Sequence, residues 1–73
     1  PNNFLVNEDS SLVLTDFGFA REYSVENKLT EYMVTKYYRA PEIMLESWNY
    51  NEKVDIWSLG CCFYEVLTGK VLF

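Results

Sequence analysis

Two short motifs enclose the part of the sequence in which side chains able to do chemistry are concentrated. Asp16-Phe17-Gly18 opens this stretch and Ala40-Pro41-Glu42 closes it. A connection of this length without a sustained helical or strand period is usually functional or disordered. Hydroxyl side chains are frequent in it, and cationic side chains lie near its ends. The hydroxyls are Tyr23, Ser24, Thr30, Tyr32, Thr35, Tyr37 and Tyr38, and the cations near the ends are Arg21, Lys36 and Arg39.

Two side chains able to bind a hard cation flank a predicted β-hairpin. Phe4 to Val6 and Leu12 to Thr15 are β-prone runs, and the turn-forming residues 7–11 between them are typical of a hairpin. Asn3 precedes the first run and Asp16 follows the second. Because an antiparallel hairpin returns its ends to the same place, we expect Asn3 and Asp16 to be neighbours. By itself such a pair identifies no metal site, since Asn and Asp commonly end strands.

Two helices are predicted after the long connection. Pro41 suits a first helical turn and starts a short helix over Glu42 to Glu46, followed by a loop over 48–51. The clearest helix runs from Glu52 to Thr68 and is stopped by Gly69. Its apolar side chains surround the helix, which is typical of a buried helix in the middle of a large domain. The remaining residues are too few to enclose it, so we expect exposed apolar surface and a larger parent protein.

Composition excludes several classes of protein. Seventy-three residues allow one small domain or a fragment, and 49% hydrophobic and 18% aromatic residues indicate a core-forming chain. The net charge is −5 and the bases are scattered, so we expect no nucleic acid partner. No run of about 20 uncharged apolar residues predicts a membrane span. The adjacent Cys61 and Cys62 predict two unbridged thiols in a reducing compartment, and the absence of histidine argues against zinc.

Four motifs in order give a resemblance to a known family. Pro1-Asn2-Asn3 matches the end of the kinase catalytic-loop motif H-R-D-x-K-P-x-N, and the D-F-G and A-P-E triplets bracket an activation segment. Residues 54–61 match the central helix of the C-terminal kinase lobe. Over its full length the chain resembles that lobe in a protein kinase of the mitogen-activated group. Thr30-Glu31-Tyr32, followed by residues 38–42, points to the extracellular-signal-regulated branch.

The resemblance implies a fold class and a domain assignment. The fold is α+β: a small hairpin, a long activation segment, a short helix and a buried central helix. Residues 1–73 would form a partial protein kinase domain, without the N-terminal lobe and the remainder of the C-terminal lobe. The catalytic aspartate and lysine of the motif would precede Pro1, so we expect residues 1–73 alone to be inactive.

The resemblance also implies ATP and Mg²⁺ as cofactors of a Ser/Thr protein kinase. Asp16 and Asn3 match the side chains that hold the magnesium ions bridging the ATP phosphates. A carboxylate and an amide carbonyl supply the hard oxygen ligands that magnesium prefers. Thr35 matches a threonine that bonds the catalytic aspartate and positions the substrate hydroxyl.

A phosphorylation switch is implied within the activation segment. Thr30 and Tyr32 match dual phosphorylation sites, and each phosphate adds about −1.5 to −2 charge that needs cationic partners. Arg21 is implied to bind the phosphothreonine, while Lys36 and Arg39 face the phosphotyrosine. The hydroxyl residues at positions 23 and 24 are interpreted as ordinary loop side chains. The implied partners are an upstream dual-specificity activating kinase, phosphatases, and protein substrates phosphorylated on Ser or Thr.

The sequence departs from the family pattern where residues 33–39 would shape the substrate pocket. The family preference is proline after the target Ser or Thr. Val34, Lys36 and Tyr37 stand where alanine, arginine and tryptophan are usual. Lysine lacks the planar fork of arginine, which predicts a weaker phosphotyrosine contact, and Val34 predicts a narrower pocket.

Asp55 and Glu42 are predicted to be structural. Asp55 stands in the first turn of the long helix, where a carboxylate is favoured. The resemblance adds hydrogen bonds to Asp55 from the catalytic-loop backbone. Glu42 resembles a glutamate that pairs with an arginine located beyond Phe73.

Two other functions stay open. A pseudokinase would act as a scaffold or binding module, although the intact Asn3 and Asp16 argue against it. A cyclin-dependent-like kinase would share the T-x-Y loop and carry a cyclin-contacting helix upstream. The residues before Pro1 would distinguish an active kinase from a pseudokinase, because an active kinase requires the aspartate of H-R-D-x-K there. For all three, an intracellular protein in the cytoplasm, the nucleus or both is expected.

Overall fold

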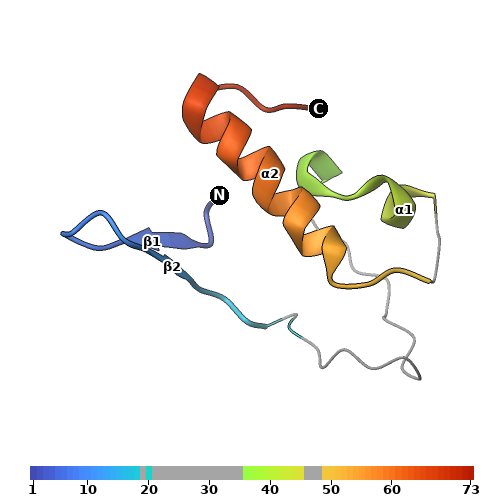
Figure 1. Cartoon of the computed structure of the whole chain (residues 1–73), viewed down its shortest axis with the longest axis horizontal. Helices are drawn as coiled ribbons and strands as arrows, with labels where there is room; N and C mark the ends of the chain where they lie inside the picture. Colours follow the sequence, from blue (N-terminus) through green and yellow to red (C-terminus); the bar gives the residue numbers. More distant parts are fainter. Residues whose placement is uncertain (19, 21–35, 46–48) are drawn as a thin grey trace.

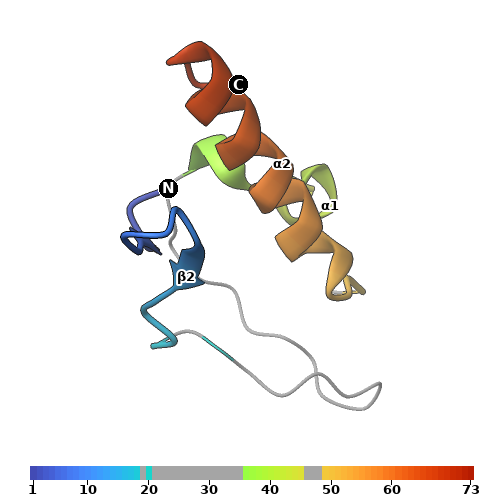
Figure 2. The same ribbon diagram turned by 60° about the vertical axis from the view of Figure 1, so that its left-hand side comes forward.

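The computed structural model describes residues 1–18, 20, 36–45 and 49–73. Its elements, in chain order, are two strands, a 3₁₀-helix and two α-helices: β1 (Phe4–Val6), β2 (Leu12–Leu14), η1 (Lys36–Tyr38), α1 (Pro41–Met44) and α2 (Lys53–Thr68). Figure 1 shows η1 and α1 beside the long helix α2, with the hairpin extending away on the other side. In the turned view of Figure 2, η1 still lies against α2. The α+β class is confirmed by the two-stranded sheet and the helices that follow it.

The predicted hairpin is present. β1 and β2 pair antiparallel with Phe4 opposite Leu14 and Val6 opposite Leu12. The strand predicted to reach Thr15 ends at Leu14. Side chains order the turn between the strands, because the Asn7 amide donates to Ser11 Oγ at 2.9 Å and the Ser11 N–H donates to an Asp9 carboxylate oxygen at 2.9 Å. The side-chain and backbone hydrogen bonds from Ser11 hold the pKa of Asp9 below its usual value.

The short helix begins and ends slightly earlier than predicted. Pro41 is the first residue of α1, where its missing N–H has no intrahelical partner to lose, and the helix ends at Met44. The predicted end at Glu46 lies outside the described residues. The turn η1 was not predicted, because three residues are too short to leave a periodic pattern.

The long helix α2 is confirmed to within one residue. It starts at Lys53, whose N–H donates to the Asn51 side-chain oxygen at 3.0 Å, so Asn51 satisfies one of the free donors at the helix start. It stops at Gly69, which has a φ of 71° and donates its N–H to the Glu65 carbonyl at 2.7 Å. The left-handed conformation at the helix end is the one that glycine adopts without a steric penalty.

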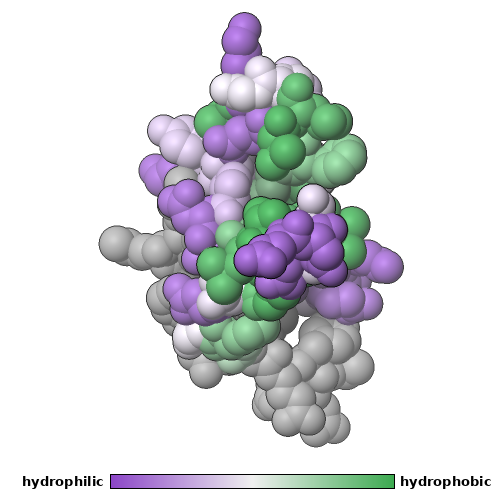
Figure 3. All heavy atoms as spheres, turned by 90° about the vertical axis from the view of Figure 1, so that its left-hand side faces the viewer, coloured by the Kyte–Doolittle hydropathy of each residue, from purple (hydrophilic) through white to green (hydrophobic). Residues whose placement is uncertain are grey.

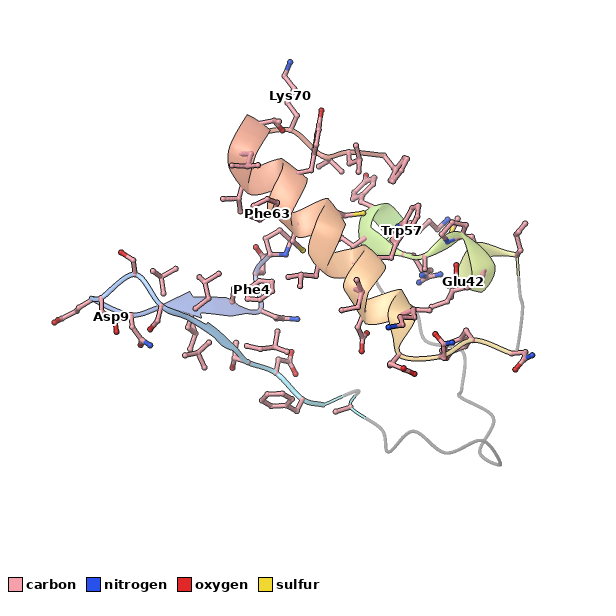
Figure 4. The ribbon with its side chains drawn as sticks, viewed as in Figure 1. Phe4, Asp9, Glu42, Trp57, Phe63 and Lys70 are labelled. Atoms are coloured by element: carbon pink, nitrogen blue, oxygen red, sulfur yellow. The ribbon has the colours of Figure 1, made fainter. Side chains whose placement is uncertain are left out.

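The exposed apolar surface predicted for this chain is confirmed on α2. Cys61 is the buried residue of α2, and Ala40 and Cys61 are the buried hydrophobic residues of the described ranges. Phe63 and Trp57 leave α2 on different sides in Figure 4 and remain 64% and 38% exposed. Figure 3 shows hydrophobic side chains on the surface of the face it views, behind the polar hairpin turn. The physical reason is the one expected: the hairpin and the short helices cannot enclose α2.

The residues after Gly69 return along one side of α2. The rings of Trp57 and Phe73 stack with centroids 5.8 Å apart and planes 11° from parallel. Together with Leu72 they line an open apolar groove of about 370 Å³ on α2, at Ile56, Gly60, Cys61 and Tyr64. Cys61 and Cys62 are both free thiols, as predicted. In the described ranges, no helix is long and apolar enough to cross a bilayer.

The two glycines of the helical region should respond oppositely to alanine. Gly69→Ala places a side chain in the left-handed conformation and should cost about 1–2 kcal/mol of helix stability. A Cβ at Gly60 would meet no atom within 4 Å, so Gly60→Ala should stabilise the helix by about 1 kcal/mol. Circular dichroism of the 73-residue chain should therefore show less helix for Gly69→Ala and more for Gly60→Ala. Equal helicity in both variants would contradict the assigned helix end.

Candidate functional site

The hairpin brings the two predicted metal ligands to the same end. The Thr15 N–H donates to the Asn3 carbonyl at 2.8 Å, so Asn3 lies beside the residue that directly precedes Asp16. This hydrogen bond extends the strand pairing by one step beyond β2 and confirms that the two ends of the hairpin meet. Asp16 and Asn3 are both exposed. Their side chains can therefore be reached by a ligand from solvent.

Asp16 has a backbone conformation that is unusual for a residue with a side chain. Its φ is 64°, in the left-handed region, where Asp is tolerated because its short carboxylate can hydrogen-bond locally. The Gly18 N–H donates to Asp16 Oδ1 at 3.3 Å, which is such a local bond. A Cβ at position 18 would lie 3.2 Å from the same oxygen. Glycine at position 18 therefore lets the backbone approach the carboxylate, and this short turn orients Asp16.

The side-chain oxygens at this end of the hairpin suit a hard cation whose other ligands come from water or a bound substrate. Asp16 offers carboxylate oxygens and Asn3 offers an amide oxygen, which are ligand types that magnesium accepts. In the ranges that the structure describes, no three His, Cys, Asp or Glu side chains are grouped as a metal site. Magnesium is usually held by one or two carboxylates together with water and substrate phosphates.

Several predicted site residues lie outside the described residues. They are Arg21, Thr30, Tyr32 and Thr35, so the phosphorylation sites and the substrate-positioning threonine stay predictions. The two other predicted phosphate ligands lie in and just after η1. Lys36 is exposed at the first position of η1, and Arg39 is half-buried directly after its last residue.

The segment that carries Lys36 and Arg39 is fastened to α2 through Tyr38. The Ser58 hydroxyl donates to the Tyr38 carbonyl at 2.6 Å, and the Tyr38 hydroxyl donates to Glu65 Oε2 at 2.5 Å. The Tyr37 ring meets the Tyr38 ring edge-on, with centroids 6.5 Å apart. Ala40, two residues further on, is fully buried. The 36–40 segment is thus bound to α2 through both the main chain and the side chain of Tyr38.

The contact with Glu65 changes the acidity of Tyr38. The hydrogen bond to the carboxylate, followed by burial and the negative charge of Glu65, raises the pKa of Tyr38 from its ordinary value of 10.0 to about 12. The physical cause is that a phenol can donate to a carboxylate, whereas a phenolate would repel it. At neutral pH Tyr38 is therefore protonated and able to donate.

Sequence reasoning gave no role to Ser58 or Glu65. The sequence feature that could have pointed to them is that they are polar residues on a mainly apolar helix. They are seven residues apart, which is about two helical turns, so their side chains lie on one face. The two residues predicted to be structural are placed as expected along the chain. Asp55 lies in the first turn of α2 and Glu42 in the first turn of α1. The hydrogen bonds implied for Asp55 and the arginine implied for Glu42 stay predictions.

Comparison with known proteins identifies the family. The family model of the protein kinase domain matches residues 1–73, so the chain belongs to the protein kinase domain family. It is 55% identical over 73 residues to mitogen-activated protein kinase 13 of Bos taurus, covering 100% of this chain and 19% of that protein. It is 53% identical to mitogen-activated protein kinase 13 of Homo sapiens and 52% identical to mitogen-activated protein kinase p38b of Drosophila melanogaster. Each of these matches covers 100% of this chain and 20% of the relative.

These matches confirm the resemblance to the mitogen-activated protein kinase group. The chain spans about a fifth of the length of the curated relatives it matches. The assignment to the extracellular-signal-regulated branch stays a prediction, because it rests on residues 30–32 and 38–42 and not on these matches.

The raised pKa of Tyr38 can be measured directly. Because the folded-state value lies above the ordinary one, the contact with Glu65 stabilises the fold fully below pH 10.0 and loses this effect as the pH rises through about 12. A difference titration of tyrosinate absorbance, wild type minus Tyr38→Phe, should show one group that titrates near 12. When the same pair of proteins is compared with Glu65→Leu in both, the pKa of Tyr38 should move back toward 10.0.

The matched control is Tyr64→Phe, on the same helix as Glu65. In this variant the group near 12 should still titrate, because Tyr64 lines the apolar groove and its replacement leaves the Tyr38–Glu65 hydrogen bond in place. An unshifted Tyr38 in the wild-type chain would contradict the hydrogen bond.

Proposed function

We propose that the chain is part of an ATP- and Mg²⁺-dependent Ser/Thr protein kinase of the mitogen-activated type. Residues 1–73 would form the section of its C-terminal lobe from the end of the catalytic loop to the central helix. The observation that carries the proposal is the closure of the hairpin, with Thr15 bonded to Asn3 at 2.8 Å in a chain that belongs to the protein kinase domain family. This hydrogen bond supports the proposal, because Asn3 then lies beside the residue before Asp16, as expected for a catalytic-loop asparagine and a D-F-G aspartate.

Asp16 and Asn3 are the residues that would hold magnesium in the parent enzyme. Magnesium held by these two side chains would supply positive charge against the negative charge that develops during phosphoryl transfer. The turn at Gly18 keeps the Asp16 carboxylate oriented, and the strand pairing keeps Asn3 at the same end. The catalytic aspartate would be supplied by the H-R-D-x-K motif before Pro1, and Thr35 would bond it.

The switch of the proposed enzyme is dual phosphorylation at Thr30 and Tyr32. An upstream dual-specificity kinase would add the phosphates and phosphatases would remove them. Arg21, Lys36 and Arg39 supply the positive charge that two phosphates require. Lys36 is exposed and can reach a phosphate from its flexible stem.

The proposed substrates are proteins with Ser or Thr followed by proline. Residues 33–39 would form the surface that binds this proline. In the part of this segment that the structure describes, Tyr38 is hydrogen-bonded to α2. The proposed location is intracellular, in the cytoplasm, the nucleus or both. Relatives named as mitogen-activated protein kinases favour this group over a cyclin-dependent-like kinase.

Asp16→Asn should abolish phosphoryl transfer in the full-length protein and leave the fold intact. Changing residues that only support a metal ligand costs about 10–100-fold, so losing a ligand charge should cost more. Transfer of labelled phosphate from ATP to a Thr-Pro peptide measures the loss, and thermal unfolding measures the fold. Asp9→Asn is the control, because Asp9 lies in the turn of the same hairpin and an asparagine there can still accept from Ser11. Wild-type turnover by Asp16→Asn would refute the assignment of Asp16 as a metal ligand, whereas a wild-type protein that transfers no phosphate would favour the pseudokinase alternative.

The proposed switch predicts a difference between two pairs of loop hydroxyls. Thr30→Ala with Tyr32→Phe should lower the activity of the full-length protein by orders of magnitude, since no phosphate can then recruit the cationic side chains. Tyr23→Phe with Ser24→Ala, the same chemical change, should leave it unchanged. Peptide phosphorylation after treatment with an activating kinase measures both. Equal activity of the two double variants would refute the switch.

A further inference from the structure

We draw no further inference here: the strongest candidate, the open apolar groove on α2 beside the stacked rings of Trp57 and Phe73, carries none because nothing in the structure shows what covers it.

Discussion

The attachment of Tyr38 to α2 is the interaction on which the ordered arrangement of residues 36–45 depends. η1 has three residues and α1 has four, and helices of this length have no stability of their own in water. They need a partner, and the sixteen-residue helix α2 is the longest element of the described chain. Ser58 and Glu65 of α2 make two directional hydrogen bonds with Tyr38, and Ala40 in the same segment is buried.

The helix that supports this segment is itself incompletely covered. Most of its large apolar side chains are exposed, including Ile56 at 61% and Val66 at 76%. A helix that is apolar on all sides is typically surrounded by protein, because leaving such surface in water forgoes the main favourable term in folding. The Trp57–Phe73 stack covers only one side. This exposure fits a chain that spans about a fifth of the length of its relatives.

Local chemistry explains what could be predicted from the sequence. Turn-forming residues 7–11 located the hairpin, and a glycine able to adopt a φ of 71° located the end of α2. Neither feature depends on distant residues. The Tyr38–Glu65 bond joins residues 27 positions apart, so no local pattern could specify it. The exposed surface of α2 could be predicted, because the remaining residues are too few to enclose a helix that is apolar on all sides.

The two described ends of the candidate site have separate supports. Asn3 and Asp16 are placed by contacts within residues 3–18, through strand pairing and the turn at Gly18. Tyr38 and its neighbours are placed by α2. The sequence between them contains Thr30 and Tyr32, to which the proposed switch assigns the phosphates. Charge added between two independently held ends can reorganise the connection without first breaking either support, which is how a phosphorylated segment can act as a switch. The end to which the proposal assigns magnesium and the end to which it assigns the substrate would then respond to one event, and each would keep its own geometry.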